Sequence, residues 1–191
     1  FAGLTKAKNL KDFDTVNFEL TKNLVDAIDD KITKLIFLSS FAAHGPGEEV
    51  NFTKAKVSDD NKPNTAYGRS KLKAENYINS NFKGKYVILR PTGVYGPRET
   101  DYFVFFQTID NHIEPYLGFV PQHLTFVYSK DLVEVCIKAF ESEISGKTYF
   151  VSDGKMYLDS EYAAISKQVL NKKTLKLKFP LFIVKWMLSV V

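Results

Sequence analysis

The stretch KLIFLSS, residues 34–40, places apolar residues on consecutive positions and then opens into two serines. A strand that is apolar on consecutive positions is covered on both faces, which is typical of parallel sheets. KYVILR, residues 85–90, repeats the pattern and is followed by Pro91, which cannot donate to a sheet ladder. The two stretches therefore predict two buried strands of a parallel sheet.

Helical patterns alternate with these strands. Apolar residues recur every three or four positions between residues 13 and 28, which predicts a helix that follows Asp12 and ends near Asp29. A second helix is expected from residues 64–65 through Ile78, with Asn64 or Thr65 as its cap. Further along the chain, the sequence predicts strands at 124–128 and 148–151, a helix capped by Asp131 between them, and a half-exposed strand at 175–179. The alternation predicts an α/β fold, a doubly wound parallel sheet with helices on both faces.

In such a sheet, ligands bind beyond the C-terminal ends of the strands. The loops that follow Leu38 and Leu89 lie at that edge. The first continues into a long polar stretch to Pro63, and long loops of this kind carry binding residues. The second, residues 92–97, is punctuated by glycine and proline and is expected to be a loop. Both loops are therefore candidate parts of a binding site.

Tyr67 and Lys71 stand four residues apart, and this spacing places both on one face of a helix. A tyrosine has a pKa of about 10, and a nearby cation stabilises the phenolate and brings the pKa toward a value suited to proton exchange with an alcohol. The pair therefore predicts an acid/base site. The alternative is a partly buried tyrosine beside a solvated lysine.

Three motifs in order carry a family resemblance. They are LSS at the end of a buried strand (residues 38–40), AYGRSK at the start of a helix (residues 66–71) and RPTGVYGP at the end of the next strand (residues 90–97). Together they resemble the extended short-chain dehydrogenase/reductases and, more narrowly, the NAD-dependent epimerase/dehydratase family. The resemblance runs from Phe1 to about Val151 and implies a Rossmann-type fold that binds NAD or NADP.

The resemblance implies catalytic roles for three residues. Tyr67 would take the proton of a substrate hydroxyl while hydride passes to the nicotinamide. Lys71 would hold the cofactor ribose and lower the pKa of Tyr67, and Ser40 would hydrogen-bond the substrate oxygen where charge develops. The alternative for the serine pair is that it caps the end of a strand.

The resemblance also implies binding residues, each of which has a purely structural alternative. Those at the cofactor would be Ala2, Gly3, Asn17, Ser39, Tyr67, Lys71, Pro91, Thr92 and Val94. On the substrate side, Arg98 would meet a phosphate, because a guanidinium forks onto such oxygens. His44 would contact the substrate, although it stands where the family usually has a tyrosine.

Composition argues against several other classes of protein. His44, His112 and His123 are too dispersed to predict a metal site, and no apolar stretch approaches the roughly 20 residues of a membrane span. The net charge of +4 is scattered except for four lysines near the end, so a nucleic-acid partner is not expected. The single Cys136 excludes an internal disulfide, which fits a reducing compartment, the cytoplasm. The Cys136 side chain itself is expected in the core.

The expected organisation is a partial NAD(P)-binding Rossmann domain over residues 1–153, with interleaved substrate-side segments, and the start of a substrate-side region over 154–191. No glycine-rich turn for a dinucleotide precedes the motifs, so we expect the sequence to be incomplete at its N-terminus. The apolar run 181–191 suggests that the sequence is truncated at its C-terminal end too. We expect residues 1–191 by themselves to be inactive. That run predicts a helix packed against a partner elsewhere, or one lying on a membrane surface.

The function expected is an NAD(P)-dependent oxidoreductase or epimerase that acts on a secondary alcohol of a nucleotide sugar. Epimerisation or reduction is favoured over dehydration, because Phe41 and Ala42 stand where similar dehydratases carry an acidic pair. The alternatives are a hydroxysteroid or dihydroflavonol-type reductase, and a non-catalytic NAD(P)-sensing module of the same fold. A homodimer is expected through the helices around Leu20 and Leu72.

Overall fold

A computed structural model describes residues 3–29, 31, 34–47 and 53–180. The chain forms two compact units. The first comprises Phe1–Thr92 and Ser129–Ser152, and the second comprises Gly93–Tyr128 and Asp153–Val191. The apolar run 181–191 lies outside the described residues. The expected division of the chain after residue 153 stays a prediction.

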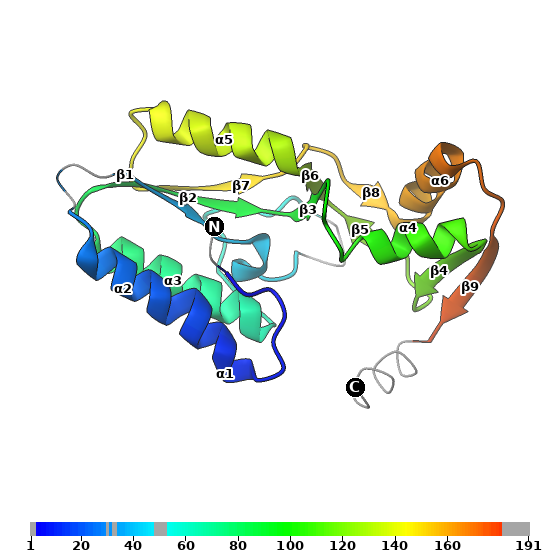
Figure 1. Cartoon of the computed structure of the whole chain (residues 1–191), viewed down its shortest axis with the longest axis horizontal. Coiled ribbons are helices and arrows are strands. Elements are labelled where there is room, and N and C mark those ends of the chain that lie inside the picture. The colour runs from blue at the N-terminus through cyan, green and yellow to red at the C-terminus, as the bar shows by residue number, and fades with distance from the viewer. Residues whose placement is uncertain (1–2, 30, 32–33, 48–52, 181–191) are drawn as a thin grey trace. The chain divides into compact units, whose positions relative to one another are not determined.

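The first unit is built on a three-stranded parallel sheet. Its order is β1 (Lys34–Leu38), β2 (Lys85–Pro91), β7 (Lys147–Val151). Helices α2 (Leu20–Ala27) and α3 (Ala66–Asn81) cover one face, and α5 (Ser129–Glu141) covers the other (Figure 1). The predicted α/β fold with a parallel sheet of Rossmann type is confirmed.

Apolar side chains fill the space between the sheet and α2 and α3. Ile78 of α3 and Ile88 of β2 are fully buried, and Phe37 of β1 is 9% exposed. Full burial of such a side chain stabilises the folded state by about 1.5–3 kcal/mol. The core cluster consists of Val25, Phe37, Ala74, Ile78, Phe82 and Ile88. This cluster fixes α3 against β1 and β2, whose C-terminal ends carry the predicted site.

The first helix differs from its prediction in two ways. It begins at Leu10, before Asp12, because the side chain of Asn9 accepts a hydrogen bond from the Lys11 amide at 3.0 Å. It also consists of α1 (Leu10–Phe13), the π-helical segment η1 (Asp14–Glu19) and α2 in direct succession. A π turn holds an extra residue and shifts the faces of a helix, and such turns are frequent at functional sites. Apolar spacing alone does not reveal it.

Helix α3 begins where one of its two predicted caps stands. The Thr65 hydroxyl accepts a hydrogen bond from the Gly68 amide at 3.0 Å, so Thr65, and not Asn64, is the cap. The 3-10 helix η2 (Phe41–Ala43) packs against this first turn. A Cβ atom on Gly68 would lie 2.1 Å from the Ala42 carbonyl oxygen, so only glycine allows the two backbones to come this close.

Helix α5 starts earlier than expected. It begins at Ser129, and Asp131 lies inside the first turn and does not cap the helix. An acidic side chain in a first turn still interacts favourably with the helix dipole.

The second unit is built from short strand pairs and two helices. The predicted loop 92–97 contains β3 (Gly93–Tyr95), and the predicted strand 124–128 is divided at Thr125, because its halves pair with different partners. The pairs are β3 with β6 (Phe126–Tyr128), β5 (His123–Leu124) with β8 (Tyr157–Leu158), and β4 (Ile113–Leu117) with β9 (Leu175–Phe179). Helices α4 (Phe103–Asp110) and α6 (Asp159–Leu170) pack together.

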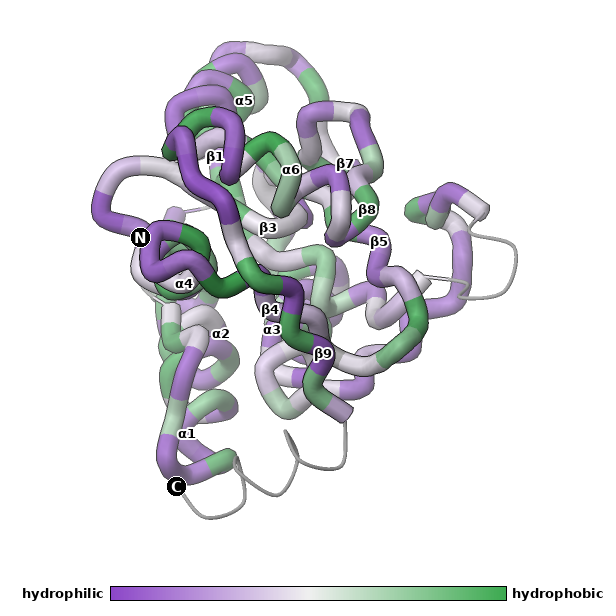
Figure 2. Tube along the Cα trace, turned by 90° about the vertical axis from the view of Figure 1, so that its right-hand side faces the viewer, coloured by the Kyte–Doolittle hydropathy of each residue, from purple (hydrophilic) through white to green (hydrophobic). Residues whose placement is uncertain are grey.

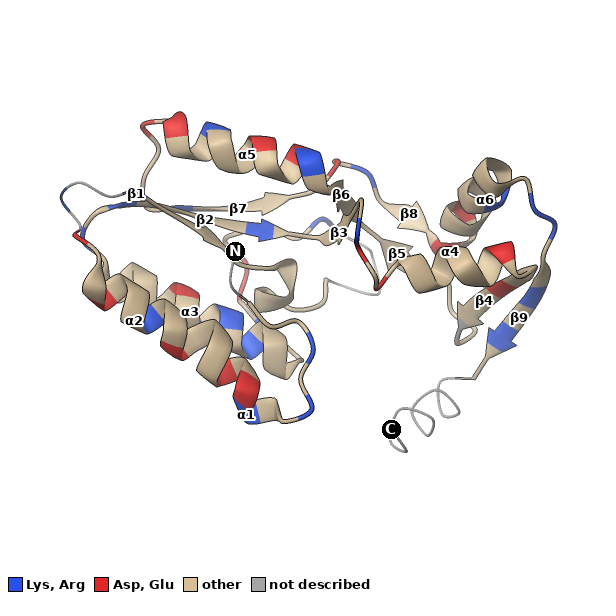
Figure 3. Cartoon of the chain, viewed as in Figure 1, with Lys and Arg blue, Asp and Glu red and all other residues tan. Residues whose placement is uncertain are grey.

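The predicted strand 175–179 is confirmed as β9, along which apolar and basic residues alternate (Figure 2). Basic positions of β9 and an acidic position of β4 lie on paired strands (Figure 3). The acidic residue, Glu114, is 1% exposed and pairs with Lys176 of β9 at 3.8 Å and with Lys167 of α6 at 2.6 Å. Some of the basic residues near the end of the sequence therefore serve internal ion pairing. No helix among the described residues is long and apolar enough to cross a bilayer.

The contact between η2 and α3 generates a test. We expect Gly68→Ala to lower the free energy of unfolding of the full chain by about 1–3 kcal/mol, because the added methyl group meets backbone atoms that cannot turn away. Urea unfolding followed by circular dichroism measures the change. Gly47→Ala is the matched control, since a Cβ there meets nothing within 4 Å in the part of the chain that the structure describes. Equal stabilities of the two variants would contradict the close approach.

Candidate active site

Ser40, Tyr67 and Lys71 all belong to the first unit. Ser40 follows β1 and caps η2, with its hydroxyl accepting from the Ala42 amide at 3.2 Å. Tyr67 and Lys71 stand in the first two turns of α3. Because η2 packs on the start of α3, the Ser40 hydroxyl comes near the Tyr67 phenol. The strand-end capping considered for Ser40 is therefore real, and it occurs together with this approach.

Tyr67 is half-buried against the Phe13 ring, whose centroid lies 6.1 Å from its own. Burial raises the pKa of Tyr67, because a phenolate loses hydration there, and interaction with the Ser40 side chain opposes the rise. The lowering of this pKa by Lys71 and a nicotinamide ring stays a prediction.

Lys71 is a buried lysine, with 5% of its surface exposed. Its ammonium donates to the Leu38 carbonyl at 2.7 Å and lies 4.6 Å from the centroid of the Phe37 ring. Burial lowers the pKa of Lys71 to about 8, and the negative charge of Glu75 opposes this change. The alternative of a solvated lysine is therefore wrong.

Asn17 lies in the π-helical segment and is 2% exposed. The Asn17 side-chain nitrogen donates to the Leu4 carbonyl at 2.9 Å and to the Ser70 hydroxyl at 3.1 Å. The Asn17 side-chain oxygen accepts from the Leu4 amide at 2.8 Å. It thus joins the segment after Gly3 to the residue before Lys71. Its contact with the cofactor stays a prediction.

A buried network beside these residues was not predicted. Ser39 donates to Glu75, and the guanidinium of Arg90 pairs with the same carboxylate at 2.6 Å. The sequence does carry a signal for it, since Arg90 is a charge at the end of an otherwise apolar strand and Glu75 follows Lys71 by one helical turn. The Ser39 hydroxyl is thus engaged inside the protein. The predicted contact of Ser39 with the cofactor stays a prediction.

His44 is 5% exposed and lies between two aromatic rings, with centroid distances of 5.5 Å to Phe41 and 5.2 Å to Phe150. Its Nδ1 atom has no hydrogen-bond partner among the described residues. Buried polar atoms normally have one, so such an atom in a candidate site is a natural point of contact for a substrate. The substrate role of His44 stays a prediction.

The remaining predicted residues belong to both units. Pro91 ends β2, and the Thr92 amide donates to the Val151 carbonyl at 3.0 Å in the first unit. Val94, in β3, and Arg98, with a φ of 71°, belong to the second unit. Ala2 lies outside the described residues. The cofactor and substrate roles of these residues stay predictions.

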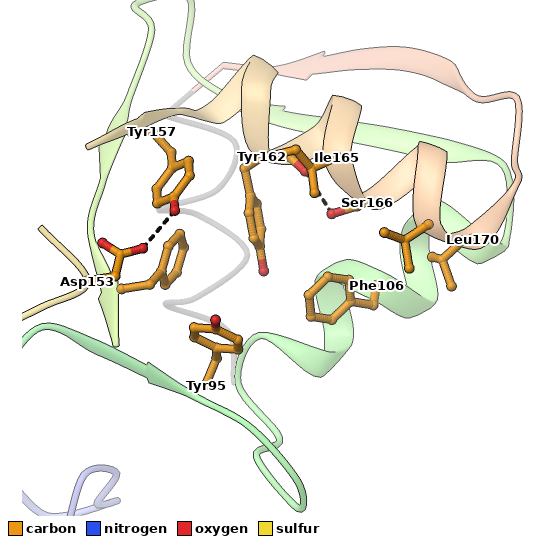
Figure 4. A pocket seen from close by; sticks show the side chains of 10 residues that line it. Tyr95, Phe106, Asp153, Tyr157, Tyr162, Ile165, Ser166 and Leu170 are labelled. Atoms are coloured by element: carbon orange, nitrogen blue, oxygen red, sulfur yellow. Dashed lines mark hydrogen bonds between the residues drawn. The ribbon is translucent and has the colours of Figure 1, made fainter. Parts of the chain in front are cut away.

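The second unit holds a cavity of about 320 Å³. It is lined largely by rings, including those of Tyr95, Phe106, Phe126, Tyr157 and Tyr162 (Figure 4). Tyr162 stacks on Phe126 with centroids 5.0 Å apart, and burial raises the pKa of Tyr162 to about 12.

Few polar groups of the described residues line this cavity. The Tyr157 hydroxyl donates to Asp153 at 2.7 Å, which satisfies part of the Asp153 carboxylate. A volume above about 300 Å³ with a mostly apolar lining is typical of small-molecule sites. The cavity is therefore a second candidate site in this chain.

A parallel α/β sheet with a buried lysine, a tyrosine one turn before it and a serine at the adjacent strand end defines the class of the short-chain dehydrogenases/reductases. The model of the NAD dependent epimerase/dehydratase family matches residues 3–152. The chain belongs to this family.

Curated relatives agree with the family assignment. A UDP-glucose 4-epimerase from Vibrio cholerae is 29% identical over 189 residues, covering 94% of this chain and 57% of that protein. Short-chain dehydrogenase/reductase family 42E member 1 from Danio rerio is 28% identical over 180 residues, covering 81% of this chain and 45% of that protein. The chain thus spans about half the length of the curated relatives it matches.

Solved structures share the fold. The UDP-glucuronic acid 4-epimerase from Bacillus cereus, in complex with NAD, superposes with a TM-score of 0.83 at 20% identity, covering 94% of this chain and 61% of that one. An ADP-L-glycero-D-manno-heptose-6-epimerase from Helicobacter pylori superposes with a TM-score of 0.77 at 25% identity, covering 91% of this chain and 58% of that one.

The Asn17 contacts generate a second test. We expect Asn17→Ala to lower the free energy of unfolding by about 1–3 kcal/mol, because it leaves both backbone groups of Leu4 without their partner. Asn81→Ala is the matched control, since Asn81 makes one exposed bond to the Tyr77 carbonyl at 3.0 Å. Urea unfolding of both variants measures the difference, and a loss no larger than the control's would contradict a structural role for Asn17.

Proposed function

We propose that the protein is an NAD(P)-dependent oxidoreductase or epimerase that acts on a secondary alcohol of a nucleotide sugar. The observation that carries the proposal is the approach of the Ser40 hydroxyl to the Tyr67 phenol, one helical turn from the buried ammonium of Lys71. Membership of the family and the epimerases among the relatives support the choice of substrate.

The residues present fit a nicotinamide cofactor. An ammonium carries three donors, and Lys71 gives one to the Leu38 carbonyl, which leaves donors suited to ribose hydroxyls. Among the described residues, an added Cβ at Gly3 would meet only Asn17, at 3.5 Å, so the packing of these residues does not demand a glycine there. This supports a role for Gly3 in letting the cofactor approach the backbone. When bound, NAD or NADP supplies the acceptor for the hydride of the alcohol carbon.

The chain's own residues would move the proton. Ser40 donates a hydrogen bond to the alcohol oxygen and holds it toward Tyr67, which reacts as the phenolate, takes the alcohol proton as the carbon is oxidised and becomes the neutral phenol. The positive charge of Lys71 stabilises the phenolate before the transfer, against the burial that raises the pKa of Tyr67. Return of the proton from Tyr67 would complete either a reduction or an epimerisation.

The two residues after Ser40 disfavour dehydration. Phe41 packs its ring on Phe150 at a centroid distance of 5.0 Å, and Ala42 offers no side-chain acid. Neither position can supply the acidic pair that elimination of water would use, which supports epimerisation or reduction.

A hydroxysteroid or dihydroflavonol-type reductase is the second candidate. The apolar, ring-lined cavity of the second unit favours it, because fused or aromatic rings pack well on such walls. Two substrate sets discriminate the candidates when given to the full chain with NAD or NADP. Turnover of UDP-sugars supports the leading proposal, turnover of hydroxysteroids or flavonols supports the second, and binding of the cofactor without turnover of either supports a sensing module.

A cytoplasmic homodimer through α2 and α3 belongs to the same proposal. Leu20 and Leu24 on α2 are each 51% exposed, as is suitable for a shared helical interface.

Tyr67→Phe tests the acid/base assignment. We expect turnover by the full chain to fall by roughly 10²–10⁴-fold, because the phenolic proton carrier is removed, while the dissociation constant for NAD stays nearly unchanged. Steady-state kinetics and calorimetric titration with NAD measure the two effects. Tyr77→Phe is the control on the same helix, since the Tyr77 hydroxyl donates to the exposed Asp26, at 2.6 Å. Full turnover by Tyr67→Phe would exclude the assignment.

A further inference from the structure

One carboxylate stands at the centre of a buried network beside the candidate site. Glu75 is 2% exposed and receives three hydrogen bonds from the Arg90 guanidinium, from Nε at 3.0 and 3.2 Å and from Nη2 at 2.6 Å. Ser39 donates to the same carboxylate. The remaining arm of Arg90, which is itself 3% exposed, donates to Asn61 at 2.9 Å. The carboxylate is thus held from two strand ends.

Packing does not explain why this pair is kept. Removing two charges from water costs as much as or more than their attraction returns, and apolar replacements of buried pairs are often neutral or stabilising. The pair nevertheless stands, almost fully buried, between α3 and the end of β2. A charge pair that is kept in spite of this cost points to a use.

The location of Glu75 indicates that use. It follows Lys71 by four residues on α3, so the two side chains lie on one face of the helix. The end of β1 connects them a second time, because the Leu38 carbonyl accepts from Lys71 and the hydroxyl of the next residue, Ser39, donates to Glu75. The ammonium and the carboxylate are therefore both fixed to the same end of β1.

We propose that Glu75 is a positioning residue which, clamped by Arg90 and Ser39, keeps Lys71 charged inside the protein. The role in catalysis rests on the proposed function, since a neutral Lys71 could neither stabilise the Tyr67 phenolate nor donate strongly to a ribose. Arg90 fixes the carboxylate in place and prevents it from turning toward solvent. The field of Glu75 offsets the burial that lowers the pKa of Lys71.

Other charged and titratable groups on the packed elements are engaged elsewhere. Asp14 of η1 pairs with Lys73 at 3.3 Å on the exposed side of α3, and Asp26 of α2 pairs with Lys22 at 2.8 Å. From the end of η2, His44 packs between aromatic rings.

Closer to Lys71 the groups are neutral or already paired. Strand β1 presents the Phe37 ring and the Leu38 carbonyl, η1 presents the neutral Asn17 to Ser70, and Tyr67 stands one turn earlier on α3. The guanidinium of Arg90, from β2, is held on the carboxylate of Glu75. Among the described residues, Glu75 is the group whose charge raises the pKa of Lys71, so its removal should lower that pKa.

Titration of Lys71 in the full chain tests the proposal. Lysine labelled with ¹³C at Cε is followed by NMR over pH, and the Lys71 signal is assigned by its loss in Lys71→Met. In the unmodified protein we expect a pKa of about 8. In Glu75→Gln we expect it to fall by roughly 1–2, as loss of a unit charge one helical turn away predicts at an effective dielectric constant of about 20.

Two further variants make the result decisive. Glu75→Gln combined with Arg90→Met removes both charges, so that Arg90 is not left unpaired in the core. It should still lower the pKa of Lys71, by less than Glu75→Gln alone, because loss of the Arg90 charge acts in the opposite direction. Glu143→Gln is the control, because Glu143 forms an exposed pair with Lys85 at 2.5 Å, and it should leave Lys71 unchanged. An unchanged Lys71 titration in the double variant overturns the proposal.

Two measurements keep this inference separate from the proposed function. A measured pKa of Lys71 below about 7 in the unmodified protein also overturns the inference, since Lys71 would then be largely neutral at pH 7 in spite of Glu75. The titration is measured on the chain without added NAD, so a failure of NAD to bind would defeat the proposed function and leave this result standing. The affinity of Glu75→Gln for NAD at pH 7 should be lower than that of the unmodified protein. It should recover toward lower pH, where Lys71 is charged again.

Discussion

The burial of one ammonium group is the constraint on which the first unit depends. A lysine with 5% exposure loses most of its hydration, and the fold compensates with the Leu38 carbonyl, the Phe37 ring and the field of Glu75. Each of these partners comes from a different part of the local structure, namely a strand end, a core face and the next turn of the helix. The end of β1 and helix α3 must therefore pack together before the Lys71 ammonium can be buried.

Backbone proximity completes the site. The absence of a side chain at Gly68 lets η2 lie against the first turn of α3, and this contact brings Ser40 near Tyr67. The π-helical segment turns Asn17 inward, where it joins the start of the chain to the helix that carries Lys71. The arrangement of the candidate site thus depends on two local departures from regular geometry, a missing side chain and a widened helical turn.

The two units differ in the kind of site they carry. The first concentrates charge and hydroxyl groups at the strand ends, as proton transfer requires, and the second encloses an apolar cavity walled by aromatic rings. Family membership agrees with the first of these, since nicotinamide chemistry needs a proton carrier near an alcohol. The apolar lining of the cavity favours the second candidate function, in which the substrate is apolar and is not a nucleotide sugar.

Sequence alone determined the parallel sheet, the cap of α3 within one residue and the spacing of Tyr67 and Lys71, because consecutive apolar runs, capping side chains and helical periodicity are local properties. Tertiary structure alone decided the π turn at Asn17, the divided strand at Thr125 and the Glu75–Arg90 pair. These depend on partners distant in sequence, and no local pattern specifies which charge meets which in the core. The same reason explains why Lys71 could be named from its motif while its burial, and the carboxylate that supports its charge, could not.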